Sequence, residues 1–132
     1  MTDRNRSVRR TQLAVSASAI FLALLGIALT FGPTEVAGLF GLPSAPLALQ
    51  LLGSALLGFG VMNWTARGST LGGIYGRAVV AGNQMHFTVG ALALLKHGFA
   101  VDGSPAFWAL TTVYVLGAAL FLHLMFGGGP RL

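Results

Sequence analysis

The chain carries at residues 36–66 the run VAGLFGLPSAPLALQLLGSALLGFGVMNWTA, 31 residues without one Asp, Glu, Lys or Arg. A helix needs about 20 apolar residues to cross a hydrocarbon core about 30 Å thick, so this run is long enough to span a membrane. Shorter uncharged runs, each close to the length of one span, occupy residues 13–31, 78–95 and 105–124. Membrane spans are helices or barrel strands, and these runs lack the alternation of barrel strands. The sequence therefore predicts an all-α fold, a transmembrane four-helix bundle in contact with the lipid bilayer.

Proline and glycine set the expected ends of these helices. Gly32 and Pro33 end the first span, and Pro33 and Pro43 flank a short apolar segment that we expect to lie as a turn of helix on the membrane surface. Ser104 and Pro105 provide an N-cap and a first-turn proline for the last span. The expected organisation is a basic arm at residues 1–10 and a single four-helix domain over residues 11–132, with helices at about 11–31, 46–65, 77–96 and 105–126.

The basic residues indicate how the bundle is oriented. Of the eight Lys and Arg residues, four lie in the arm, two at the ends of the loop 67–77 and one at Arg131, whereas Lys96 lies on the opposite side. Positive charge collects on the cytoplasmic side of membrane proteins. We therefore expect a multi-pass protein of the bacterial inner membrane with both termini in the cytoplasm. We interpret the arm as an orientation signal and expect no nucleic-acid partner.

No pattern in the sequence indicates catalysis or a metal centre. Cysteine is missing, and no Asp or Glu lies within a predicted span, which argues against thiol chemistry and carboxylate-coupled transport. His86 and His123 differ in expected depth by about 7 Å, which argues against a haem held by both. We predict no catalytic residue, no metal site and no bound cofactor, and we expect that the protein is not an enzyme.

The third span and the loop before it carry the candidate ligand-binding residues. Asn83 and His86 are three residues apart and share nearly one helix face, where they either bond a neighbouring helix or contact a ligand such as a quinone. The glycine-rich loop between Arg67 and Arg77 is either a cytoplasmic turn or a site for a lipid headgroup or a partner subunit. The candidate ligand-binding residues are His86, Asn83, Arg67 and Arg77.

Small and aromatic residues mark the predicted packing faces and membrane interfaces. Small residues let helix backbones approach closely in lipid, and Trp and Tyr collect at the level of the headgroups. The candidate helix-packing residues are Ser54, Gly58, Gly82 and Gly90, and the candidate interface anchors are Trp64, Tyr75 and Trp108.

The middle of the chain contains Leu51-Leu52-Gly53, the run LGFGVMNW at residues 57–64, Arg67, and Gly82-Asn83 followed by His86. On these residues the chain, over about residues 32–95, resembles small four-helix bacterial inner-membrane proteins of the broadly DoxX-like group. The resemblance implies a four-helix fold with cytoplasmic termini and brings no catalytic residues. Some DoxX-type proteins are associated with quinone-linked or redox complexes, which favours a quinone among the candidate ligands.

Three functions are consistent with the sequence. The leading hypothesis is a non-enzymatic accessory or scaffold subunit of a larger membrane complex, or a homo-oligomer, because the predicted helices carry glycine-lined faces and no chemistry. The alternative is a quinone- or lipid-headgroup-binding subunit of a redox complex. The third is a small-solute permease.

Overall fold

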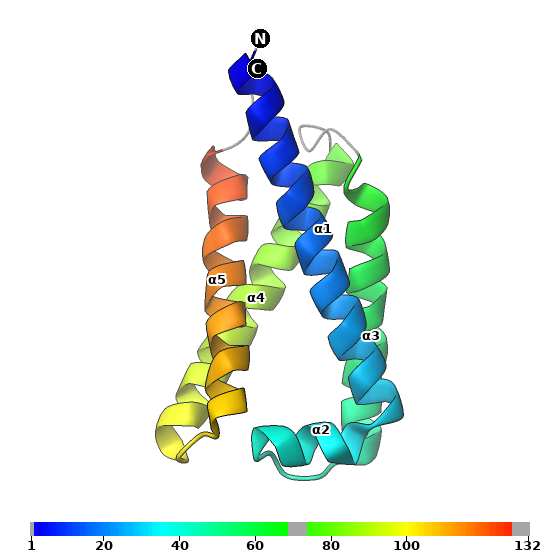
Figure 1. The fold of residues 1–132 in the computed structure, drawn as a ribbon, viewed down its shortest axis with the longest axis vertical. Coiled ribbons are helices and arrows are strands. Elements are labelled where there is room, and N and C mark those ends of the chain that lie inside the picture. The colour runs from blue at the N-terminus through cyan, green and yellow to red at the C-terminus, as the bar shows by residue number, and fades with distance from the viewer. Residues whose placement is uncertain (1, 69–73, 128–132) are drawn as a thin grey trace.

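The computed structural model describes residues 2–68 and 74–127, and this part of the chain is almost entirely helical. The helices are α1 (Thr2–Phe31), α2 (Pro33–Phe40), α3 (Pro46–Ala66), α4 (Ile74–Ala100) and α5 (Pro105–Gly127). All except α2 contain a stretch long and apolar enough to cross a membrane. The prediction of an all-α bundle with four membrane-spanning helices is confirmed. The first turn of α1 and the last turn of α5 lie at the same end of the bundle (Figure 1).

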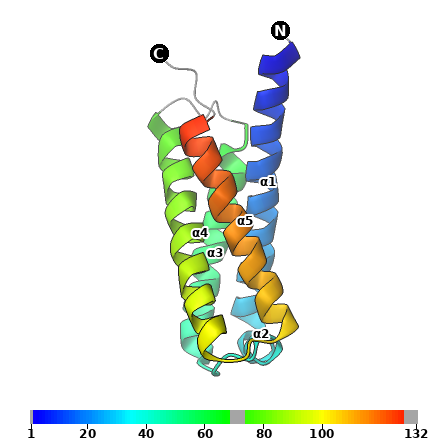
Figure 2. The ribbon, with the colours of Figure 1, turned by 90° about the vertical axis from the view of Figure 1, so that its left-hand side faces the viewer.

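The bundle consists of two tightly packed helix pairs. Helix α1 packs along α3 and α4 packs along α5, whereas the two pairs contact each other much less. In Figure 1 the pairs lie closest together toward the start of α1 and diverge toward α2, and Figures 1 and 2 both show α2 at the opposite end of the bundle. The two pairs therefore enclose a wedge that is wide at the α2 end.

Glycines bring α1 and α3 into backbone contact. A Cβ atom added to Gly26 would lie 2.6 Å from the backbone nitrogen of Leu57, and one added to Gly60 would lie 2.8 Å from the backbone nitrogen of Ala23. Both distances are shorter than any relaxed contact, so only glycine fits at these positions. Close backbone approach replaces the hydrophobic driving force that is missing between helices in lipid. Ser54 and Gly58 lie on a different face of α3, described below.

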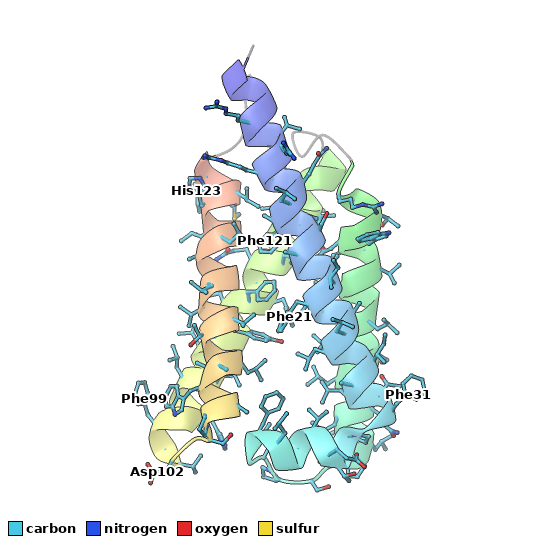
Figure 3. The ribbon with its side chains drawn as sticks, viewed as in Figure 1. Phe21, Phe31, Phe99, Asp102, Phe121 and His123 are labelled. Atoms are coloured by element: carbon cyan, nitrogen blue, oxygen red, sulfur yellow. The ribbon has the colours of Figure 1, made fainter. Side chains whose placement is uncertain are left out.

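The α4–α5 pair is built differently, with aromatic rings seated on glycines. A Cβ atom on Gly90 would lie 2.5 Å from the ring of Tyr114, and one on Gly117 would lie 2.5 Å from the ring of Phe87. Phe87 is buried and stacks on Phe121, with ring centroids 5.6 Å apart. These rings fill the space between α4 and α5, and Phe121 points into the bundle in Figure 3, in contrast to the exposed Phe31 and Phe99.

Helix α2 forms where its flanking residues predict it. Pro33 lies in its first turn, and Gly41 ends it in the left-handed conformation with φ 66°. The Leu42 amide donates to the Ala37 carbonyl at 2.9 Å, which closes the end of the helix. The Ser104 hydroxyl donates to the Leu39 carbonyl at 3.2 Å and accepts from the Phe107 amide at 3.1 Å, so it caps α5 and holds α2 against it.

Two helices are longer than the sequence suggested. Helix α1 begins at Thr2 and not near residue 11, so the basic arm is part of this helix. The side chains of Arg6, Arg9 and Arg10 are exposed along it. No glycine or proline separates the arm from the span, which explains why the helix does not stop there. Helix α4 begins at Ile74 and ends at Ala100, beyond the expected bounds of 77–96 at both ends.

Candidate functional site

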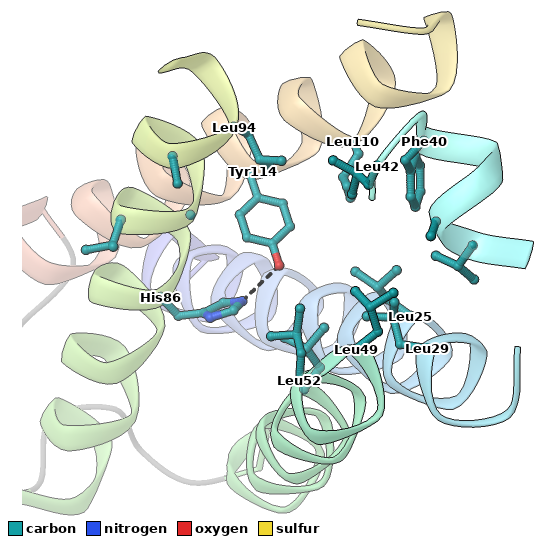
Figure 4. Close-up of a pocket in the computed structure, with 16 residues that line it drawn as sticks. Leu25, Leu29, Phe40, Leu42, Leu49, Leu52, His86, Leu94, Leu110 and Tyr114 are labelled. Carbon is teal, nitrogen blue, oxygen red and sulfur yellow. Dashed lines mark hydrogen bonds between the residues drawn. The ribbon is translucent and has the colours of Figure 1, made fainter. Parts of the chain in front are cut away.

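An apolar cavity of about 390 Å³ lies in the wedge between the two helix pairs. All five helices contribute to the 16 residues that line it, and α2 closes its wide end (Figure 4). Leucines dominate the wall, among them Leu25 and Leu29 of α1 and Leu52 and Leu56 of α3. The volume is within the range of small-molecule sites, which are typically about 300–1,000 Å³.

Two polar side chains meet in this apolar wall. The hydroxyl of Tyr114 on α5 lies 3.2 Å from Nε2 of His86 on α4, within hydrogen-bonding distance. Figure 4 shows this bond crossing from one helix to the other at the inner end of the cavity. Which of the two groups donates depends on the tautomer of His86, because a neutral imidazole has one donor and one acceptor nitrogen.

Aromatic neighbours fix the positions of both rings. The ring of His86 stacks on Phe59 of α3, with centroids 5.2 Å apart, and meets the edge of Phe87 at 5.2 Å. The ring of Tyr114 is buried and meets the edge of Phe21 of α1 at 6.2 Å. The polar pair is therefore held between aromatic rings from α1, α3 and α4.

The ring of His86 can form a second hydrogen bond. Among the described residues, Tyr114 provides the one hydrogen bond to its ring, and that bond uses Nε2. Nδ1 therefore remains for another group. A phenolic hydroxyl both donates and accepts, so Tyr114 can also bond a second partner. A polar group that is mostly enclosed by apolar side chains favours a ligand that satisfies it.

A second polar cluster joins the two helix pairs at their narrow end. Asn63 of α3 and Asn83 of α4 exchange two hydrogen bonds, each 2.7 Å long, and both side chains are fully buried. Asn63 Nδ2 also donates to the Ser18 hydroxyl of α1 at 3.1 Å, and Asn83 Nδ2 donates to the Val79 carbonyl at 2.8 Å. We call Ser18, Asn63 and Asn83 the amide clasp. Its carboxamide groups are occupied by one another, so it holds helices together and has no free group for a ligand.

The structure does not bring the four candidate ligand-binding residues together. His86 lines the cavity, whereas Asn83 belongs to the amide clasp and pairs with Asn63, not with His86. The guanidinium of Arg67 lies 3.7 Å from the ring centroid of Trp64 and donates to the Trp64 carbonyl, and Arg77 is exposed. The interior of the glycine-rich loop, residues 69–73, lies outside the described residues.

The candidate packing residues divide into two groups. Gly90 receives the ring of Tyr114, and a Cβ atom on Gly82 would make an ordinary contact at 3.8 Å with Phe59. Ser54 and Gly58 are exposed, and a Cβ atom on Gly58 would meet nothing within 4 Å. Within the described chain, α3 turns the flanking glycines Gly53 and Gly60 toward α1, and Ser54 and Gly58 lie on its exposed face.

The candidate interface anchors lie near helix ends. Trp64 is half exposed in the last turn of α3 beneath Arg67. Trp108 lies in the first turns of α5, where its ring meets the edge of Phe99 at 5.6 Å. Tyr75 lies in the first turn of α4, and its side chain lies outside the described part.

Tyr114 is the site residue that the sequence analysis missed. Tyrosines of membrane proteins collect at the interfaces. Tyr114 instead lies near the middle of the span Pro105–Phe126, which is the signal that could have identified it. The described residues contain no group of three or more His, Cys, Asp or Glu side chains placed to hold a metal ion.

The four apolar helices define a multi-pass α-helical membrane protein. No protein-family model matches the chain, and neither the curated proteins nor the solved structures that were searched contain a match.

Proposed function

We propose that the chain is a non-enzymatic membrane subunit that binds a lipophilic molecule, such as a quinone, in the cavity between its helix pairs. The observation that carries the proposal is the hydrogen-bonded pair of His86 and Tyr114 at the inner end of an otherwise apolar cavity. Ligand sites are typically apolar with a few polar groups that fix the orientation of the ligand. A quinone carbonyl accepts from either a tyrosine hydroxyl or an imidazole N–H, and its ring suits the aromatic neighbours of His86.

We further propose that the protein lies in the bacterial inner membrane with the narrow end of the bundle in the cytoplasm. Arg6, Arg9 and Arg10 are exposed at that end, and Arg67 and Arg77 flank the loop there. Glu35 and Asp102 lie at the α2 end. The positive-inside rule supports this orientation.

Identification of what co-purifies with the protein tests the proposal directly. The protein would be extracted into native nanodiscs and its lipids, quinones and protein partners counted by mass spectrometry. We expect a lipophile at a molar ratio near one in the wild type. Tyr114→Phe removes one hydroxyl and keeps the ring on Gly90, so it should lower retention by roughly two- to tenfold, since one hydrogen bond contributes about 0.5–1.5 kcal/mol. Thr112→Val alters an exposed hydroxyl on the same helix and should change nothing.

A second candidate function, a scaffold subunit or homo-oligomer, is favoured by the exposed face of α3. Ser54 and Gly58 are four residues apart and neither packs against another described helix. Such small-residue faces let helices of different chains approach closely. If Gly58→Leu reduces the size of the assembly on a native gel while lipophile retention is unchanged, the two functions are separate. If the wild type migrates as a monomer, the scaffold function is excluded.

A further inference from the structure

The cavity has an opening toward the lipid between α3 and α4. Of its lining residues, Leu52 on α3 and Val89 on α4 are 46% and 55% exposed, and Ala93 on α4 is also exposed. The lining residues of the other pair of facing helices, α1 and α5, are better covered, and Leu29 and Tyr114 are buried. We call Leu52, Val89 and Ala93 the lateral mouth.

The route from the aqueous phase at the α2 end is closed by apolar side chains. Val36, Ala37 and Phe40 of α2 line the cavity, and Ala37 is 1% exposed. The hydrogen bond from Ser104 to the Leu39 carbonyl holds α2 in this position. A water-soluble ligand would have to shed its hydration shell against these residues, whereas a lipid-dissolved one meets an open mouth.

The uncharged wall of the cavity restricts which head groups a ligand can have. None of the 16 described lining residues is Asp, Glu, Lys or Arg. A phosphate or carboxylate head would therefore be buried without a counter-charge, which is costly in this environment. His86 and Tyr114 instead suit a single uncharged carbonyl or hydroxyl group.

We infer that the ligand is an uncharged amphiphile that enters sideways from the lipid, head first, so that its head bonds His86 and Tyr114 while its apolar tail leaves through the lateral mouth. The inference rests on the proposed function, since it assumes that the cavity is occupied. Quinones and long-chain or polycyclic alcohols share this chemistry, because each presents a neutral carbonyl or hydroxyl oxygen at one end of an apolar body. Charged phospholipids do not.

Two photo-crosslinking probes test the orientation. Each probe is a benzoquinone with a decyl chain and one diazirine. The ring-proximal probe carries the diazirine on the chain carbon next to the ring, and the chain-end probe carries it at the end of the chain. After irradiation in nanodiscs, crosslinked peptides would be mapped by mass spectrometry. The ring-proximal probe should label the neighbourhood of His86, Gly90 or Tyr114, and the chain-end probe should label the lateral mouth. Unlabelled decyl quinone and a long-chain alcohol should both compete, and phosphatidylglycerol should not.

Tryptophan substitutions provide matched controls for the access route. Val89→Trp and Leu52→Trp narrow the mouth and should slow labelling by the ring-proximal probe several-fold. Leu92→Trp and Leu51→Trp place the same side chain on exposed positions of the same two helices that do not line the cavity, and should leave the rate unchanged.

The outcomes separate the inference from the proposed function. Four outcomes would overturn the inference and leave binding in the cavity intact. They are saturable labelling with the two positions reversed, labelling of α2 by the chain-end probe, competition by phosphatidylglycerol, and equal labelling rates in the mouth and control variants. A lack of saturable labelling by either probe would overturn both.

Discussion

Asn63 and Asn83 form a reciprocal carboxamide pair in which both N···O distances are 2.7 Å, and the pair joins two helices that otherwise contact each other little. Neither side chain is exposed to solvent. In lipid, such a pair has few competing partners, so it fixes which faces of α3 and α4 meet. The two asparagines also set where the helix pairs join, and hence where the wedge begins to open toward α2.

Breaking the pair from one side should destabilise the bundle. Asn63→Leu leaves Asn83 Oδ1 buried without its donor, which costs about 1–3 kcal/mol. The double variant Asn63→Leu, Asn83→Leu removes both amides and should recover much of the loss. Unfolding in mild detergent with increasing SDS measures the effect, with Thr65→Val, which alters an exposed hydroxyl on α3, as the control. A single variant as stable as the wild type would show that the clasp does not hold the pairs together.

The α1–α3 contact should tolerate no side chain at Gly60. Gly60→Ala places a Cβ atom 2.8 Å from the Ala23 nitrogen, so the helices must separate, at a cost of about 1–3 kcal/mol. Gly58→Ala, two residues away, meets nothing within 4 Å and should leave the fold unchanged or slightly more stable. Thermal unfolding of the two variants in the same detergent compares them. Equal melting temperatures would contradict the close packing described here.

The position of Tyr114 should depend on Gly90. Gly90→Ala brings a Cβ atom within 2.5 Å of the Tyr114 ring, which must move away and lose its bond to His86. We expect lower stability, by about 1–3 kcal/mol, together with loss of the bound lipophile. Gly82→Ala is the control on the same helix, because its nearest neighbour would be Phe59 at 3.8 Å. Retained binding in Gly90→Ala would argue that Tyr114 does not hold the ligand.

Glu35 offers a pH measurement outside the spans. Its own backbone N–H and then the Thr34 hydroxyl, 2.9 Å away, lower the pKa of the Glu35 carboxyl from its ordinary value. Because the folded pKa is depressed, the small stabilisation is present above the ordinary pKa and disappears as pH falls through the lowered one. Glu35 is the one glutamate in the chain, so selective ¹³C-glutamate labelling gives a single NMR signal to titrate. Thr34→Val should raise the midpoint and Thr34→Ser should not.

The sequence predicted the spans well because charge and proline leave clear marks. The uncharged run at 36–66 contains most of α2 and all of α3, and the prolines at 33, 43 and 46 mark where these two helices begin and where the segment between them lies. The packing faces were harder, since α3 has small residues on two faces, Gly53 and Gly60 on one and Ser54 and Gly58 on the other. Helical periodicity does not say which face meets α1.

The candidate site was only partly predictable, because it combines residues distant in the chain. His86 was a candidate because it is a polar residue within a span, and the structure places it in the cavity wall. Its partner Tyr114 is 28 residues away on another helix, and the partner of Asn83 is Asn63, which lies 20 residues away on α3. Partner choice across helices depends on crossing geometry, which spacing along one helix does not contain.

The tight helix pairs have a consequence for biosynthesis. Each pair consists of spans that follow one another along the chain, so the α1–α3 hairpin can form in the membrane before α4 has left the ribosome. Asn63 then has Ser18 as its available partner until Asn83 is inserted. Docking of the second hairpin therefore satisfies the carboxamide and creates the cavity in the same step, so the cavity does not exist until synthesis is nearly complete.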